Sequence, residues 1–140
     1  VGAPDAYAGE LPVIFATLVP GASATEEELL AFTAARVDEA PARPKWVSVI
    51  GAMPMTNVGK IYKPELRAMA ALQVVNAAVA EACAELGVPE AALPVVKTEG
   101  ESLVRVQIDS AAAGSLAAPL QERLQKALEP LPFKTRIAAQ

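Results

Sequence analysis

Residues 54–67 of the 140-residue chain read PMTNVGKIYKPELR, and in this stretch a glycine stands directly before a lysine. Gly59 can adopt backbone angles that are closed to other residues, so it can turn the chain sharply and leave little bulk beside Lys60. The pattern therefore predicts a tight turn that presents one long cationic side chain. A lysine ammonium held in this way is suited to a phosphate or a carboxylate.

Two simpler interpretations fit this stretch less well. A phosphate-binding P-loop needs glycine five positions before the Gly-Lys pair and Ser or Thr after it, where this chain has Pro54 and Ile61. A solvated lysine on a surface turn would explain an isolated Gly-Lys pair. The pattern here continues from Pro54 to Arg67, which makes a chance turn the weaker interpretation.

Pro-x-x-x-x-Gly-Lys, followed by hydrophobic, aromatic and basic residues and then Leu-Arg, resembles the end of the AMP-forming acyl-CoA synthetases of the adenylate-forming superfamily. The resemblance is strong over 54–67 and extends to the Gly-x-Pro-Asp, Gly-Glu and Pro positions within residues 1–20. Ala42-Arg43 departs from it, because many relatives carry an aromatic-lysine pair there. The resemblance implies that Lys60 is the catalytic lysine of a mobile C-terminal domain, with Gly59, Lys63 and Arg67 as candidates for positioning substrate or nucleotide.

The family chemistry is an expectation that follows from this resemblance. A fatty or related carboxylic acid would react with ATP and Mg²⁺ to give an acyl-adenylate, and the acyl group would then pass to CoA. ATP and CoA would be bound mainly by an N-terminal domain, so residues 1–140 alone are expected to be inactive. The resemblance also makes Lys60 a candidate target for a lysine acetyltransferase.

Composition limits the other classes of function. Hydrophobic residues make up 53% of the chain and the net charge is −4, so a folded globule is expected and nucleic acid is an unfavourable partner. There is no histidine, which excludes a Ser-His-Asp triad and histidine-ligated metal, and no metal site is predicted. The single cysteine, Cys83, lies in an apolar helical pattern, favours a core position and fits a reducing cytoplasm. We expect no transmembrane segment and no signal peptide.

The order of patterns predicts an α+β fold with two units. Residues 1–67 should form a small sheet with packed helices: a strand within Leu11–Val19, a helix opened by a capping box at Thr25 and Glu28, and a strand over Trp46–Ile50. The predicted buried side of that helix comprises Leu29, Leu30, Phe32, Ala34 and Val37.

Residues 68–140 are expected to form a C-terminal extension with the order helix, strand, strand, helix, strand. A helical pattern runs to Leu86 and is stopped by Gly87. Strands are predicted over 93–98, 102–109 and 133–137, and a leucine spacing of four predicts a helix over 116–128. This order can make an open sheet with helices on one face, separate from the surface around Lys60.

Two alternatives to an acyl-CoA synthetase stay open at this stage. The chain could belong to an adenylation domain that loads a carrier protein, or it could be a non-catalytic regulatory or dimerisation module, with the extension supporting homo-oligomers. Residues upstream of Val1 and downstream of Gln140 would distinguish them. The acyl chain length cannot be read, because residues of an acyl pocket are not recognisable in this chain.

Overall fold

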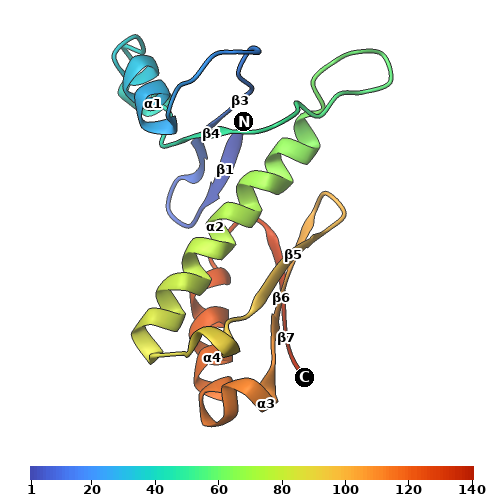
Figure 1. The fold of residues 1–140 in the computed structure, drawn as a ribbon. Helices are drawn as coiled ribbons and strands as arrows, with labels where there is room; N and C mark the ends of the chain where they lie inside the picture. The colour runs from blue at the N-terminus through green and yellow to red at the C-terminus, as the bar shows by residue number, and fades with distance from the viewer.

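The computed structural model describes residues 1–140, and its mixture of helices and short sheets confirms the α+β class (Figure 1). A single long helix, α2, runs through the molecule, with one group of elements at each of its ends. The elements are β1 (Gly2–Asp5), β2 (Gly9–Pro12), β3 (Ile14–Ala16), α1 (Glu26–Ala34), β4 (Val47–Val49), α2 (Lys63–Leu86), β5 (Val95–Glu99), β6 (Leu103–Ile108), α3 (Ser110–Ala113), α4 (Ala117–Leu128) and β7 (Lys134–Ala139).

The strand expected within Leu11–Val19 is confirmed as β3, but the run also holds the end of β2, because the chain changes its pairing partner there. β1 and β2 form an antiparallel pair, whereas β3 pairs in parallel with β4. Val13 donates its backbone N–H to Val1, and the next residue, Ile14, donates to Trp46 (2.9 and 3.1 Å). The first pairing therefore extends to Val13, whose carbonyl also accepts from the N-terminal amino group of Val1 (3.0 Å). The expected single sheet is therefore two separate two-stranded sheets.

Helix α1 begins as predicted, but it buries none of its side chains. Thr25 accepts from the backbone N–H of Glu28, and the Glu28 carboxylate accepts from the N–H of Thr25, which confirms the capping box. The expected buried side is wrong: Phe32 is 56% exposed, and the Arg36 guanidinium lies 3.6 Å from its ring centroid. The helix packs against the three-residue strand β4, which is too short to cover its apolar face.

Helix α2 belongs to both hydrophobic clusters of the molecule. It starts with Pro64 in its first turn and ends at Gly87, which adopts a left-handed conformation (φ 67°), as the sequence predicts. Near its start, Leu66 and Ala70 pack in a small cluster with Ala3, Val13 and Phe15. Farther along, its buried residues join a cluster of 13 that includes β6 and α4. The expected division between residues 67 and 68 thus falls inside one continuous helix.

By length and composition α2 could also cross a membrane, whereas the sequence predicts no transmembrane segment. The core helix of a folded domain passes the same test, and buried α2 side chains belong to both clusters. Cys83, on this helix, is 3% exposed, and burial raises the pKa of its thiol. This position confirms Cys83 as a small core residue.

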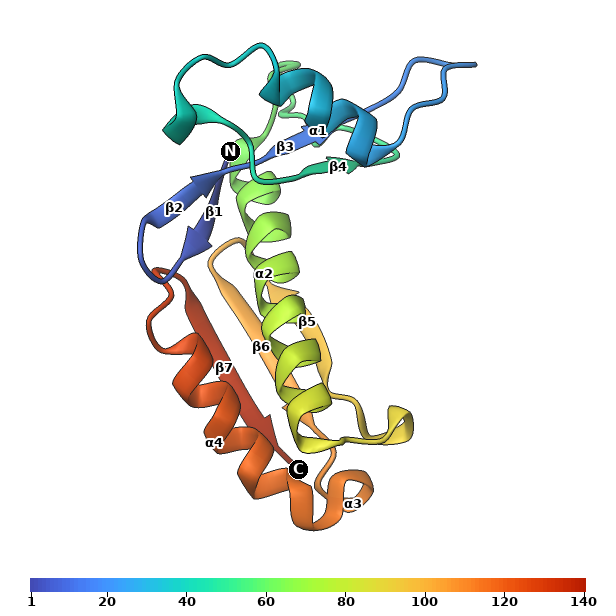
Figure 2. The same cartoon turned by 90° about the vertical axis from the view of Figure 1, so that its left-hand side faces the viewer.

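The extension forms a three-stranded sheet with one covered face. Its strand order is β5-β6-β7, antiparallel between β5 and β6 and parallel between β6 and β7. Helices α2 and α4 lie side by side on one face of this sheet (Figure 2). The predicted alternation of β6 and the leucine spacing of α4 are confirmed, because the inward side chains are fully buried. These are Val104, Val106, Ile108, Leu120, Leu124 and Leu128.

Candidate functional site

Lys60 belongs to the loop between β4 and α2. This loop projects beyond the start of α2 (Figure 1). Met55 and Ile61 close the loop as an isolated antiparallel bridge. Within the loop, Thr56 makes two hydrogen bonds to the backbone of Lys60. Its N–H donates to the Lys60 carbonyl (2.7 Å), and its hydroxyl oxygen accepts from the Lys60 N–H (3.1 Å). Gly59, at φ +77°, makes the turn before the lysine, as its position predicts. The lysine backbone is therefore fixed at both its N–H and its carbonyl.

The side chain of Lys60 is free to act on a group outside this chain. It is exposed and makes no hydrogen bond or ion pair within residues 1–140. Three apolar residues around it are also exposed: Met55 (53%), Val58 (79%) and Ile61 (51%). A cation surrounded by exposed apolar side chains is suited to a site that becomes closed to water when another surface covers it.

The other two cations of the motif stand apart from this loop. Lys63 and Arg67 lie in the first turns of α2 and line different hollows. Lys63 borders one of about 200 Å³ beside Ile61. Arg67 borders one of about 460 Å³, together with residues of the β5–β6 turn and the start of β7. Of the candidate site residues, the structure thus brings Gly59 and Lys60 together on one turn and directs Arg67 toward the extension.

Tyr62 links the base of the Lys60 loop to the extension. Its N–H donates to the Pro54 carbonyl (2.8 Å), which closes the loop, and its hydroxyl donates to the Glu101 carboxylate. This hydrogen bond raises the pKa of Tyr62, because the phenolate would lose the bond and face the carboxylate charge. The expectation that the extension is separate from the surface around Lys60 is therefore wrong. Tyr62 is the aromatic position of the motif, but its pairing with Glu101 has no sequence signal, since a pair 39 positions apart leaves no local pattern.

A second polar link fixes α2 against β4. The Trp46 indole N–H donates to the Gln73 side-chain oxygen (2.8 Å), and the Gln73 amide donates to the Ser48 hydroxyl (2.9 Å). Ser48 is 7% exposed, so this partner satisfies a buried polar group. Gln73 is not among the residues predicted to be structural. The one sequence signal for a buried role is that this glutamine stands among the apolar residues of 68–75. The link fixes the helix that begins at the end of the Lys60 loop.

Comparisons with known proteins cover the N-terminal part of this chain. Residues 1–60, ending at Lys60, match the family model of the AMP-binding enzyme C-terminal domain. Over 67 residues the chain is 43% identical to marinolic acid–CoA ligase of Pseudoalteromonas sp. (strain SANK 73390), a match that spans 48% of this chain and 10% of that ligase. No solved structure matches the chain. The match over residues 1–60 and the likeness to a CoA ligase therefore support a C-terminal domain of an adenylate-forming enzyme in this part of the chain.

Proposed function

We propose that this chain is the mobile C-terminal domain of an acid–CoA ligase that forms AMP, with Lys60 as the catalytic lysine of adenylation. The observation that carries the proposal is the loop itself, in which a backbone fixed at Thr56 and Gly59 presents an exposed, unpaired ammonium. The ligase that is 43% identical to this chain over 67 residues is named for an acid and CoA, which supports this reaction class. A fatty or related carboxylic acid is the proposed substrate class.

The proposed role of Lys60 follows from the charges of the reaction. When a carboxylate attacks the α-phosphate of ATP, two anions approach each other and negative charge accumulates on the phosphate oxygens. An ammonium held between them offsets this repulsion most strongly where water is excluded. The exposed Met55, Val58 and Ile61 would exclude water once the loop docks on the N-terminal domain. Loss of such a donor typically costs about 3–4 kcal/mol, or 10²–10³ in rate.

The remaining parts of the reaction are assigned to the N-terminal domain. In this proposal ATP with Mg²⁺, CoA and the acid bind mainly to that domain. After adenylation the C-terminal domain would rotate, withdrawing Lys60 and opening the path for CoA. In this proposal residues 1–67 act as the catalytic cap, and residues 68–140 are an extension that shares α2 with it.

The proposal is tested on the full-length protein with ATP, CoA and a panel of carboxylic acids of different chain length. We expect acid-dependent release of pyrophosphate and formation of acyl-CoA, and no turnover by residues 1–140 alone. Pyrophosphate release without acyl-CoA, together with acyl transfer to a carrier protein, would instead identify an adenylation domain. Absence of any acid-dependent pyrophosphate release would overturn the enzymatic proposal and favour a regulatory module.

A further inference from the structure

The face of the β5-β6-β7 sheet opposite α2 and α4 carries a row of three cations. The strand register places Lys97 opposite Arg105, and Arg105 opposite Arg136. Like charges directly opposite each other on a sheet destabilise it. The chain as a whole is acidic, with net charge −4, so the row does not reflect composition. Glu99 offsets part of this repulsion, and the cationic groups that it leaves unpaired are available for an interaction outside the chain.

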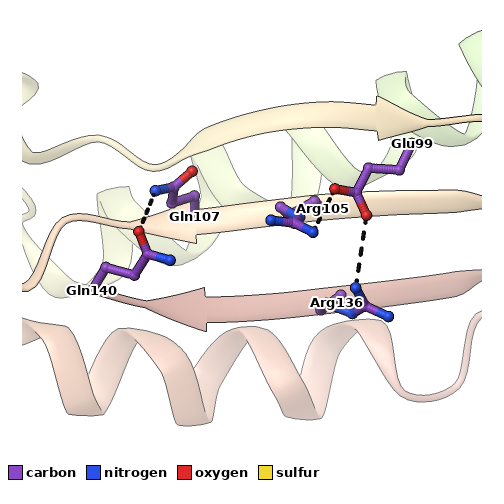
Figure 3. A network of polar contacts seen from close by, with 5 residues as sticks. All are labelled: Glu99, Arg105, Gln107, Arg136 and Gln140. Atoms are coloured by element: carbon purple, nitrogen blue, oxygen red, sulfur yellow. Dashed lines mark hydrogen bonds and ion pairs between the residues drawn. The ribbon is translucent and has the colours of Figure 1, made fainter.

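One carboxylate already binds to this row. Glu99 lies 2.5 Å from Arg105 and 3.8 Å from Arg136, between their guanidinium groups (Figure 3). The guanidinium of Arg105 is left with a buried Nε that has no hydrogen-bond partner. Lys97 is exposed and makes no ion pair, and the Arg136 side chain is 61% exposed. The face therefore binds the carboxylate of Glu99. Lys97 and the exposed part of Arg136 remain available to further carboxylates.

A hollow of about 390 Å³ borders the row, with Leu93 and Val95 on its apolar side and Asp109 among its polar residues. It lies between Leu93, Val95 and the ends of β6 and β7. Leu93 and Val95 are 47% and 50% exposed. Gln107 and Gln140 join across its floor through a side-chain hydrogen bond of 2.9 Å (Figure 3). Cations and exposed apolar side chains thus stand next to each other on one uncovered sheet face.

We propose that this face, defined by Leu93, Val95, Lys97, Arg105 and Arg136, docks an acidic amphipathic helix of a partner protein. A helix laid on the open face would complete a helix–sheet–helix sandwich, a common way to bury a sheet. Its carboxylates would meet the cationic row and its apolar side chains would cover Leu93 and Val95. Complementary charge of this kind fixes orientation and speeds association. The proposal is independent of the reaction assigned to Lys60.

Other anionic partners fit this face less well. Single-stranded nucleic acid is bound on sheets by aromatic side chains that stack on the bases. The outward positions of these three strands hold no aromatic residue; they are Val95, Lys97, Glu99, Leu103, Arg105, Gln107, Lys134, Arg136 and Ala138. Glu99, at the end of the edge strand β5, would also repel phosphates. An acidic protein helix can instead place its apolar residues next to Glu99 and its carboxylates beyond it.

The test uses residues 1–140 and a fluorescent helical peptide built from repeats of Glu-Ala-Leu-Glu-Glu-Leu-Glu, whose leucines lie on one face, with fluorescence anisotropy as the readout. The test variant is Lys97→Gln/Arg136→Gln. The control variant, Lys45→Gln/Lys126→Gln, removes the same charge from two exposed lysines away from this face. We expect saturable binding, weakened about five- to tenfold in the test variant and unchanged in the control, since the test variant loses two exposed ion pairs with the peptide. Amide shifts of a ¹⁵N-labelled chain should map to β5–β7.

Several results would overturn the proposal. One is equal weakening in the two double variants, and another is the absence of saturable binding. Tighter binding of poly(U) or of phosphatidylglycerol vesicles than of the peptide would assign the face to nucleic acid or to lipid. Self-association of residues 1–140 that disappears in Lys97→Gln/Arg136→Gln, and not in the control, would make a second copy the occupant.

Discussion

Tyr62 donates a hydrogen bond from its hydroxyl to the carboxylate of Glu101, which lies 39 positions later in the chain. Tyr62 is the residue before α2, and its N–H closes the Lys60 loop at Pro54. Glu101 belongs to the turn between β5 and β6 of the extension. The base of the candidate catalytic loop is therefore in contact with the extension, and a change in one unit can reach the other through a single side-chain pair.

The first prediction concerns the titration of Tyr62. Its pKa is raised by the hydrogen bond to Glu101, so the stabilisation from this pair is present below the unfolded tyrosine pKa of about 10 and is lost as pH rises through the folded pKa. In a Tyr7→Phe background Tyr62 is the one remaining tyrosine, and phenolate absorbance follows it alone. Glu101→Gln should lower its titration midpoint. An unchanged midpoint would show that the pair does not persist in solution.

The second prediction concerns truncation. A chain that ends at Arg67 should lose the fold of residues 1–67, because it lacks Ala70, fully buried in the first cluster, and Gln73, which binds Trp46 and Ser48. A chain that ends at Leu86 keeps these residues and should retain the fold of residues 1–67, although the α2 side chains of the larger cluster become exposed. Fluorescence of Trp46, the single tryptophan, reports the difference. Native fluorescence in the shorter chain would contradict the role given to α2.

The third prediction concerns the core of the extension. Leu124 is fully buried in the cluster of 13 residues, so Leu124→Ala should lower the free energy of unfolding by about 2–5 kcal/mol. Gln125 is the exposed neighbour on α4 and provides the control. Gln125→Ala should change the free energy of unfolding by less than about 0.5 kcal/mol. Urea unfolding measures both. Similar small losses in the two variants would mean that α4 is not packed as described.

The fourth prediction concerns acetylation of Lys60. The exposed loop makes this ammonium accessible to an acetyltransferase, and acetylation removes the charge that the proposed chemistry uses. Full-length enzyme carrying acetyl-lysine at position 60 should therefore lose adenylation activity as Lys60→Ala does, and deacetylation should restore it. Acetyl-lysine at position 126, on α4, is the control. Full activity of the enzyme acetylated at position 60 would show that adenylation does not require the positive charge of this lysine.

The sequence was sufficient to predict the elements whose signals are local. The alternation of Val104, Val106 and Ile108, the leucine spacing of α4 and the Thr25–Glu28 capping box each reflect the period or the end of one element. The Lys60 turn was likewise predictable from a contiguous motif with Gly59 at positive φ.

Contacts between distant segments could not be predicted in this way. The change of partner at Val13 and Ile14 depends on where β1 and β4 lie. The same holds for Trp46 with Gln73 and for Tyr62 with Glu101, because each pair joins elements whose mutual position is set by the whole fold. The exposed Phe32 has a related cause, since a helical pattern shows which side is apolar and not whether another element covers it.

The most direct test of the central proposal is the effect of Lys60→Ala on the two half-reactions of the full-length enzyme. Acyl-adenylate formation should fall by about 10²–10³, and CoA transfer from a supplied adenylate should be nearly unchanged, because the lysine acts in the first step alone. Lys126→Ala should leave both rates unchanged. Equal losses in the two half-reactions of Lys60→Ala, or no loss in adenylation, would contradict the assignment of Lys60 as the adenylation lysine.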